Sequence, residues 1–403
     1  MLRAAVIAAA AALATAPAAG AWTTLTGGVQ NTVIPSLLVT QAGTELASFE
    51  SQVAGTISVS RNRAAAKIVV TGDPIAGRTQ LVQQPNGAIQ LYFPNAQGVG
   101  RLTSTDDGAS WTGPIQTQSH TTGPVQSATV MPDGTPLFAQ DGTGFVNVFR
   151  GLNGESVKNV WTRCCGYHET LAVDSSGLVQ VAFYSNADPD GATVYETLGA
   201  DLSPAVTLPL KPVAEHEAPL VADRSGNTFL AWAPGSPNAT SVSVVPFRGG
   251  SPSGDGVKFG SQLNNPDPHM ALSVDAQDSV WAVWTQGGTL YAARSRSHGA
   301  HFGATVGVAV PGTVYELSAL ALAASNPGTV DVVVNAGTTL IEQQLQPGLS
   351  VHVYKKTKKV GKKTIAVWWA QALDDGFGVP GVRFSGPGRH ANGDASGRAQ
   401  LTG

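Results

Sequence analysis

The sequence predicts an all-β protein whose main part is a β-propeller, and its composition and internal repetition carry this prediction. Of the 403 residues, 47 are glycine and 25 are proline, and only 13% are charged. This composition favours many turns between short strands, and the low charge argues against a disordered chain. A strand–turn–strand pattern also recurs seven times, which is typical of a repeat architecture.

Residues 1–21 have the features of a secretory signal peptide. Arg3 supplies one positive charge, Ala4 to Leu13 is a run of small apolar residues, and Ala19-Gly20-Ala21 supplies a cleavage pattern. We therefore expect a secreted, extracellular protein whose mature chain starts at Trp22. The apolar run is too short to span a membrane, and no later segment is long enough, so we expect no membrane span.

Each repeat joins an apolar strand to a second, aromatic-rich strand through a turn that contains Asp, Asn or Gly. The clearest copy runs from Thr170 to Tyr184 and turns at Ser176-Gly177. The other copies occupy residues 34–49, 80–93, 127–139, 219–232, 270–284 and 317–334. Successive copies start about 42 to 52 residues apart, close to the roughly 40 to 50 residues of one propeller blade. We predict seven blades over residues 22–349. Six blades are the alternative because the last copy is weak, and a pair of β-sandwiches is the alternative architecture.

Charge and cysteine content narrow the function classes. The net charge is −3, so the chain lacks the excess of positive charge that is typical of nucleic-acid-binding proteins. The two cysteines, Cys164 and Cys165, are adjacent. In an exported protein we expect them to form a vicinal disulfide, although free or intermolecularly paired thiols are the alternative.

The segment from residue 350 onward differs from the repeats. Six of the 24 basic residues lie within nine positions, at Lys355, Lys356, Lys358, Lys359, Lys362 and Lys363. Binding to acidic polymers is one interpretation. We favour a solvated hairpin whose lysines protect a strand edge. The later segments Val379-Pro380-Gly381-Val382 and Asp394 to Ala399 resemble a small immunoglobulin-like accessory domain of secreted bacterial proteins. Residues 350–403 are therefore expected to form an incomplete module of this kind.

One short motif resembles the Asp-box (BNR repeat) of sialidase-like propellers. It consists of Ser104, Asp106, Gly108, Ser110 and Trp111, and residues 295–302 look like a degraded copy with Ser297 at the aspartate position. Asp106 is expected to cap a tight turn, Gly108 to supply an unusual backbone angle and Trp111 to pack beneath. In the family this box is structural and lies away from the reaction centre, so the resemblance indicates fold rather than catalysis.

Residues 32–50 also resemble the first blade of sialidases, in which a Phe/Tyr-Arg-Ile-Pro segment supplies an arginine that grips the substrate carboxylate. Ile34 and Pro35 match, whereas Val33 stands at the arginine position. Valine cannot form the bidentate guanidinium–carboxylate pair that such recognition requires. We therefore expect no ordinary sialidase turnover. Among the other arginines, Arg163 is the best candidate to contact a ligand because it directly precedes the cysteine pair.

Polar residues precede the inner strands in the second half of the predicted propeller. Equivalent positions of successive blades surround one axis, so we expect these side chains to meet at one mouth of the central channel. The candidate ligand-binding residues are His168, His216, Glu217, His269 and Arg163, and the candidate catalytic groups are Tyr167, Glu169, Tyr315 and Glu316. The last four are chosen because the resemblance implies a Tyr–Glu nucleophile pair.

These residues lead to three functional hypotheses. The favoured one is a secreted monomer that recognises a glycan or another small extracellular ligand, with no cofactor and no metal. An active exo-α-sialidase-type glycosidase is the first alternative, and a structural or adhesive surface protein is the second. The three histidines also form a donor set for zinc, which we consider less favoured, and hydrogen bonds between blades would give the polar residues a purely structural role.

Overall fold

The computed structural model describes residues 21–29, 34–51, 55–72, 78–96, 98–118, 125–142, 145–161, 163, 165–187, 191–213, 215–260, 269–314, 320–323, 328–386 and 389–401. These residues contain 35 strands and no helix. The all-β class predicted from the sequence is therefore confirmed for the described part of the chain. No helix that is long and apolar enough to cross a membrane occurs there.

Seven antiparallel sheets follow one another along the chain, and we number them in the order of their first strands. Sheet 1 contains β2 (Ser36–Val39), β3 (Glu45–Ser51), β4 (Thr56–Arg61) and β5 (Lys67–Thr71). Sheet 2 contains β6 (Gln80–Gln83), β7 (Ile89–Asn95), β8 (Gly98–Ser104) and β9 (Thr112–Gln118). Sheet 3 contains β10 (Val125–Val130), β11 (Pro136–Gly142), β12 (Phe145–Arg150) and β13 (Ser156–Trp161).

The remaining sheets repeat this order with one variation. Sheet 4 contains β14 (Gly166–Val173), β15 (Val179–Ser185), β16 (Ala192–Leu198) and β17 (Pro204–Leu210). Sheet 5 contains β18 (Leu220–Ala222), β19 (Asn227–Trp232), β20 (Val242–Arg248), β21 (Ser251–Pro252) and β22 (Val257–Phe259), the last two both paired with β20. Sheet 6 contains β23 (Met270–Val274), β24 (Val280–Gln286), β25 (Thr289–Ser295) and β26 (Val306–Ala309).

Sheet 7 is completed by the beginning of the described chain. It contains β27 (Leu320–Ala323), β28 (Val330–Asn335), β29 (Thr339–Leu345) and β1 (Thr23–Gly27), and β1 pairs antiparallel with β29. The repeat pattern did not predict this pairing. It joins the two ends of the repeat region and gives the last sheet its fourth strand, so that β29 is hydrogen-bonded along both of its edges.

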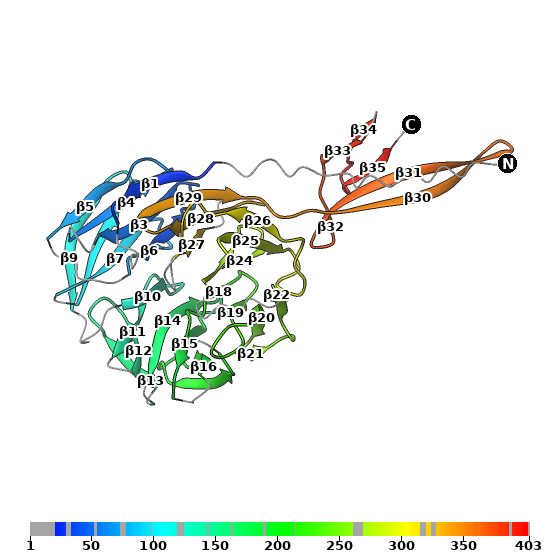
Figure 1. Cartoon of the computed structure of the whole chain (residues 1–403). Helices are drawn as coiled ribbons and strands as arrows, with labels where there is room; N and C mark the ends of the chain where they lie inside the picture. Colours follow the sequence, from blue (N-terminus) through cyan, green and yellow to red (C-terminus); the bar gives the residue numbers. More distant parts are fainter. Residues whose placement is uncertain are drawn as a thin grey trace.

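The first strands of the sheets form a closed ring. Each first strand contacts the first strand of the next sheet, in the order β2, β6, β10, β14, β18, β23 and β27, and β27 contacts β2. The sheets accordingly surround a common centre, as in a β-propeller (Figure 1). This arrangement places the beginnings of the first strands around one axis.

The hydrophobic core lies between neighbouring sheets. One cluster joins Phe229 and Val244 of sheet 5 to Met270 and Trp284 of sheet 6. Both β7 and β15 are buried along their whole length, because each second strand is covered by sheets on both sides. The apolar side chains therefore pack between the sheets, and the centre of the ring is a separate region.

The C-terminal part begins with a long hairpin that points away from the ring (Figure 1). Its strands are β30 (Ser350–Val360) and β31 (Lys363–Asp374), followed by β32 (Phe377–Gly378), β33 (Arg383–Gly386), β34 (Arg389–Asn392) and β35 (Arg398–Leu401). β35 pairs with β31 near the base of the hairpin, between Trp368 and Gln371. This C-terminal part has a small hydrophobic core of its own, which is formed by Ala370, Ala372, Phe384 and Ala399.

Candidate functional site

A cavity of about 190 Å³ lies at the centre of the ring. Its lining comes from the first strands of six sheets, from sheet 1 to sheet 6, and from the residues directly before them. The polar lining residues are Ser36, Arg78, Gln80, Ser127, Thr170 and Glu217. The cavity therefore gathers polar groups from several sheets at one place, as a small-ligand site does, and most of its exposed lining is polar.

An ion pair crosses this cavity. Arg78 precedes β6 of sheet 2 and Glu217 precedes β18 of sheet 5, so the two groups come from sheets that are not neighbours in the ring. Arg78 Nη1 donates to Glu217 Oε1 at 2.7 Å, and Nη2 donates to Oε2 of the same carboxylate. The side chains are only 12% and 11% exposed. This bidentate geometry holds the planar guanidinium in one orientation inside the channel.

A neighbouring carbonyl orients Arg78 further. The backbone carbonyl of Gln126, which precedes Ser127 in β10, accepts hydrogen bonds from Arg78 Nη1 at 3.3 Å and from Gln80 Nε2 at 3.1 Å. Sheets 2, 3 and 5 therefore all contribute to the position of the guanidinium. The sequence analysis assigned no role to Arg78, although this residue stands just before a first strand, as Glu217 does.

Of the predicted polar ring, the structure brings Glu217 to the cavity. Its neighbour His216 is fully buried, where Nε2 accepts the Ala233 N–H at 3.2 Å and lies 3.4 Å from Thr193 Oγ1. Adjacent residues of an extended segment point to opposite sides. His216 therefore packs between strands while Glu217 reaches the channel, and the expected convergence of both side chains does not occur.

Glu169 and His269 are also enclosed in the packing. They are 0% and 4% exposed, whereas the residues that follow them, Thr170 and Met270, line the cavity. Thr170 Oγ1 donates to the Ala218 carbonyl at 2.6 Å, which links sheet 4 to the segment before sheet 5. Glu169 and His269 are not among the residues that line the cavity, and their contact with a ligand stays a prediction.

Tyr167 and His168 form a second polar group at the beginning of β14. A β-bulge between Tyr167 and Thr170 gives His168 a φ of 60°. His168 Nε2 lies 3.1 Å from Oε1 of Glu215, and the rings of Tyr167 and Tyr184 stack at a centroid distance of 6.4 Å. The hydrogen bond with His168 lowers the pKa of Glu215, and burial raises the pKa of Tyr184. Both His168 and Glu215 keep exposed surface, with side chains 26% and 55% exposed.

The other predicted site residues lie elsewhere or outside the described chain. The Arg163 guanidinium lies over the Trp161 ring at 5.7 Å and does not line the cavity. Cys165 is disulfide-bonded, and its N–H donates to Asn186 Oδ1 at 2.9 Å. Cys164, Val33, Tyr315 and Glu316 lie outside the described residues.

The turn at residues 104–111, called here the first box turn, is held by one carboxylate. Asp106 accepts hydrogen bonds from Ser104 Oγ at 2.8 Å, the Ser110 N–H at 2.9 Å and Ser110 Oγ at 2.5 Å. The bonds from Ser110 and Ser104 lower the pKa of Asp106 to about 2. Gly108 has a φ of +79°, and Trp111 packs against the core between sheets 1 and 2. These contacts organise the turn and lie on a different part of the molecule from the lining of the axial cavity.

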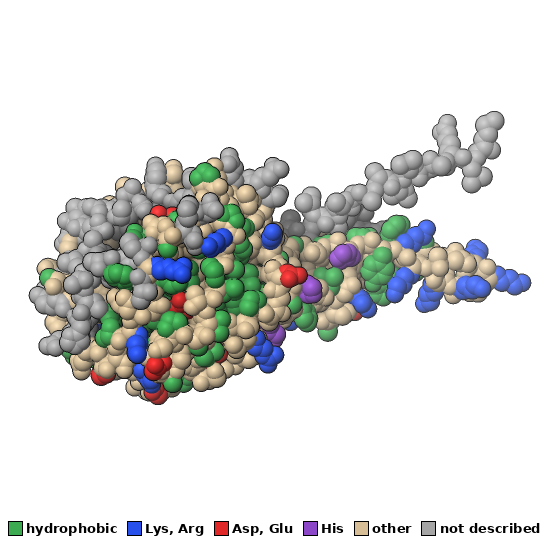
Figure 2. Space-filling view, turned by 90° about the horizontal axis from the view of Figure 1, so that it is seen from below, with side chains coloured by type: hydrophobic (Ala, Val, Ile, Leu, Met, Phe, Trp, Pro, Cys, Tyr) green, Lys and Arg blue, Asp and Glu red, His purple; other side chains and the backbone are tan. Residues whose placement is uncertain are grey.

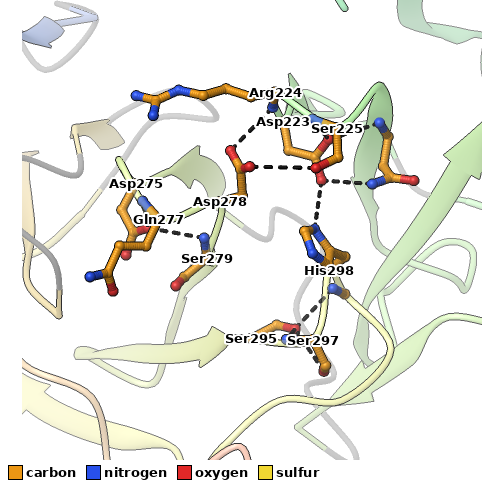
Figure 3. Close-up of polar contacts among 12 residues, drawn as sticks. Asp223, Arg224, Ser225, Asp275, Gln277, Asp278, Ser279, Ser295, Ser297 and His298 are labelled. Atoms are coloured by element: carbon orange, nitrogen blue, oxygen red, sulfur yellow. Dashed lines mark hydrogen bonds and ion pairs between the residues drawn. The ribbon is translucent and has the colours of Figure 1, made fainter.

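The turn at residues 295–302, called here the second box turn, is held differently. Ser297 Oγ accepts the His301 N–H at 3.0 Å and donates to Asp375 Oδ2 at 2.7 Å, and the Arg296 N–H donates to the same oxygen at 2.6 Å. His298 Nδ1 lies 3.0 Å from Asp223 Oδ2 of sheet 5 (Figure 3). The degraded motif thus connects sheet 6 to sheet 5 and to the C-terminal hairpin.

A buried ion pair accompanies the second box turn. Arg294 Nε donates to Asp374 Oδ2 at 2.8 Å, and its Nη2 contacts the same oxygen. The two side chains are 8% and 0% exposed. Burial raises the pKa of Asp374, and the bonds from Arg294 oppose that rise.

Three carboxylates gather where sheets 1 and 7 meet. Glu45, Asp331 and Glu342 place carboxylate oxygens within 4.8 Å of one another, and Arg63 contacts all three. Burial and the charge of Asp331 raise the pKa of Glu45 to about 7, against the effect of Arg63. Because a single arginine faces three carboxylates, Glu45 takes up a proton more readily than an isolated glutamate does. The sequence analysis missed this cluster because its members are far apart in the chain.

Comparisons with known proteins reveal similarity of fold only. No known family and no curated protein matches this sequence. Virginiamycin B lyase from Staphylococcus aureus, with selenomethionine, superposes with a TM-score of 0.50 at 12% identity, over 80% of this chain and 98% of the lyase. Its inactive variant with quinupristin gives 0.50 at 12% identity, over 81% and 99% of the two chains. The lyase is itself a β-propeller. The chain has the fold of a β-propeller.

An α-L-arabinanase from Penicillium chrysogenum, complexed with arabinobiose, superposes with a TM-score of 0.48 at 11% identity, over 82% of this propeller chain and 99% of the arabinanase. Identities this low do not transfer a reaction or a substrate, so function must be argued from the site itself.

Proposed function

We propose that the chain is an exported, seven-bladed, sialidase-like propeller that recognises a glycan or another small extracellular ligand at its axial mouth, without ordinary sialidase turnover. The observation that carries this proposal is the Arg78–Glu217 pair across the central cavity. On this proposal, sheets 1 to 7 are the blades and residues 350–403 are an accessory module of immunoglobulin-like type.

The chemistry of the cavity favours a ligand with an acidic group and hydroxyls. Arg78 presents a fork of donors that matches a carboxylate, and Glu217 is an acceptor for sugar hydroxyls. Ser127 and Thr170 add hydroxyl groups to the same lining. We propose that a ligand carboxylate binds Arg78 in place of Glu217, whose released oxygens then accept hydrogen bonds from hydroxyl groups of the sugar.

The size of the cavity limits the part of the ligand that enters. A volume of about 190 Å³ is below the roughly 300–1,000 Å³ of sites that enclose a drug-sized molecule. We therefore propose that one terminal sugar unit enters the channel. The half-exposed group of Tyr167, His168 and Glu215 is a surface on which further units would stack and form hydrogen bonds.

The composition of the lining favours binding over hydrolysis. Glycosidases of the common type use two carboxyl groups that flank the scissile bond. In the described lining Glu217 is the one carboxylate, and both of its oxygens are bound by Arg78. The alternative exo-glycosidase would need Glu169 or Glu316 beside the ligand.

Calorimetric titration with 3′-sialyllactose and lactose tests the proposal. We expect the acidic sugar to bind wild type and the Arg78→Lys variant to lose about tenfold in affinity, because lysine cannot form the bidentate pair. Arg224→Lys is the matched control, since Arg224 is exposed and contacts the Ala276 carbonyl instead. If no glycan of a broad panel binds wild type, the structural or adhesive hypothesis replaces this one.

Turnover of a fluorogenic sialoside separates the two remaining hypotheses. We expect no release of the fluorophore by wild type. Release that disappears in Glu169→Gln or in Glu316→Gln, with Glu217→Gln still active, would establish the exo-glycosidase instead.

A further inference from the structure

The hairpin of β30 and β31 concentrates positive charge. The segment 343–373 contains six lysines and neither aspartate nor glutamate. Among the residues that the structure describes, none of these lysines forms an ion pair with a carboxylate. Figure 2 shows the Lys and Arg side chains distributed along the projecting hairpin up to its tip. The lysines are therefore available to a partner rather than used within the fold.

The same hairpin exposes large apolar side chains. Val353, Val360, Ile365 and Trp368 are 48%, 53%, 43% and 41% exposed. The exposed large hydrophobics described in the propeller occur singly, one on each of four different outer strands, at Ile68, Ile115, Val157 and Val206. Scattered apolar residues need no explanation, whereas a cluster of them on one projecting element indicates an interaction surface.

Register places lysines and apolar residues beside one another on both faces. Val360 lies opposite Lys363, Lys358 opposite Ile365, and Lys355 opposite Trp368. Cross-strand partners share one face of a hairpin. Three of the four exposed apolar side chains, Val360, Ile365 and Trp368, therefore have an ammonium group next to them, whereas Val353 lies opposite Ala370. The Lys356 ammonium lies 5.5 Å from the Tyr354 ring centroid and 6.0 Å from that of Trp369.

We propose that this hairpin docks the protein onto the surface of a bilayer that contains anionic lipid. The lysines face the phosphate groups, while Val360 and Ile365, which share one face of the hairpin near its tip, enter the boundary between headgroups and acyl chains. A soluble anionic polymer satisfies the lysines equally well but leaves the apolar side chains in water. The cluster of exposed apolar residues therefore favours a lipid surface. This docking site is separate from the axial cavity and does not depend on its ligand.

Co-sedimentation of the full chain with vesicles tests the proposal. We expect binding to vesicles of equal parts phosphatidylcholine and phosphatidylglycerol, and at least tenfold weaker binding to pure phosphatidylcholine. Each lysine near an anionic surface contributes a factor of roughly five in partitioning. The quadruple variant Lys358→Gln, Lys359→Gln, Lys362→Gln and Lys363→Gln is expected to lose more than a hundredfold, and the same four changes to Arg are expected to keep the binding.

A second variant isolates the apolar contribution at constant charge. Val360→Ser with Ile365→Ser is expected to lower the partition coefficient about tenfold, because two exposed aliphatic groups no longer enter the lipid boundary. Ile115→Ser with Val206→Ser is the matched control, which removes two exposed aliphatic groups from outer strands of the propeller. Near-ultraviolet circular dichroism of each variant checks that the fold is retained.

The results that would overturn the proposal are equally specific. Wild type that does not sediment with the anionic vesicles contradicts it directly. Wild type that binds heparin, with the apolar variant still sedimenting as wild type does, would identify an anionic polymer as the partner. The four-arginine variant keeps the positive charge at the same four positions. If it fails to bind the anionic vesicles, positive charge at these positions is not what holds the hairpin to the bilayer.

Discussion

Two turns of the propeller share one motif and are closed by different carboxylates. In the first box turn Asp106 accepts the bonds that hold residues 104–110 together. In the second box turn Ser297 occupies the equivalent position, and Asp375, which directly follows β31 of the C-terminal hairpin, accepts bonds from the Ser297 hydroxyl and the Arg296 N–H. The comparison teaches that the motif can lose its carboxylate without losing the turn, provided that another segment supplies one.

The difference also changes what each turn does. In the first box turn, between β8 and β9 of sheet 2, the Asp106 carboxylate is satisfied within the turn, and Asp107 contacts Arg61 of the neighbouring sheet 1. In the second box turn the Ser297 hydroxyl and the Arg296 N–H donate to Asp375. The neighbouring Arg294 binds the buried Asp374. A degraded motif has thereby become the place where the C-terminal hairpin is attached to the ring.

The largest effect is expected from Asp374→Ala. This change leaves the Arg294 guanidinium buried without its carboxylate, and breaking a buried pair in this way costs about 3–5 kcal/mol. Urea denaturation followed by tryptophan fluorescence measures the loss in the free energy of unfolding. The matched change in the first box turn, Asp106→Ala, should cost clearly less because no buried charge is left behind.

A double variant separates the loss of the pair from the stranded charge. Replacing both Arg294 and Asp374 with apolar residues, as Arg294→Met with Asp374→Leu, is expected to recover most of the lost stability. A double variant as unstable as Asp374→Ala would mean that the ion pair itself, rather than the unpaired guanidinium, is what the structure requires.

A smaller effect is expected from Ser297→Asp, which restores the sequence of the first box turn. The new carboxylate closes the turn from within but faces Asp375, whose Oδ2 lies 2.7 Å from the present hydroxyl. This repulsion should weaken hairpin attachment by at least about 1 kcal/mol, which is the value for two unit charges 4 Å apart in bulk water. Limited proteolysis of the segment 346–349 is expected to accelerate, while the unfolding midpoint of the ring changes little. Unchanged proteolysis would show that Asp375 does not replace the missing aspartate.

The local part of this fold was predictable and the closing part was not. Alternating apolar residues and Asp-Gly or Asn-Gly turns identify the first two strands of each sheet, because strand pairing across a short turn is a local property. The segment Thr23–Gly27 carries no such signal, since most of its residues are polar or glycine. Its partner Thr339–Leu345 lies at the other end of the repeats, and pairings so distant cannot be deduced from spacing.

The same limit applies to the candidate site. The position before each first strand was the right place to search, and it led to Glu217. It did not lead to Arg78, because the search concentrated on the second half of the repeats. Nor does residue type reveal which of two adjacent polar groups faces the axis, as the buried His216 beside Glu217 demonstrates.

The smallest and most specific expected effect is an opposite response of the two turns to acid. Asp106 has its pKa lowered to about 2 by the hydrogen bonds from Ser110 and Ser104, so its contribution to stability is present above its usual value of 3.8 and is lost as the pH falls through about 2. Asp374 has its pKa raised by burial, so the folded state takes up the proton more readily than the unfolded chain does, and its contribution grows as the pH falls. Measured against pH by urea denaturation, the stability advantage of wild type over Asp106→Asn should shrink toward pH 2. Its advantage over Asp374→Asn should instead increase on acidification. Parallel curves for the two variants would show that both carboxylates are held in the same way, and the distinction between the two turns would then have no energetic basis.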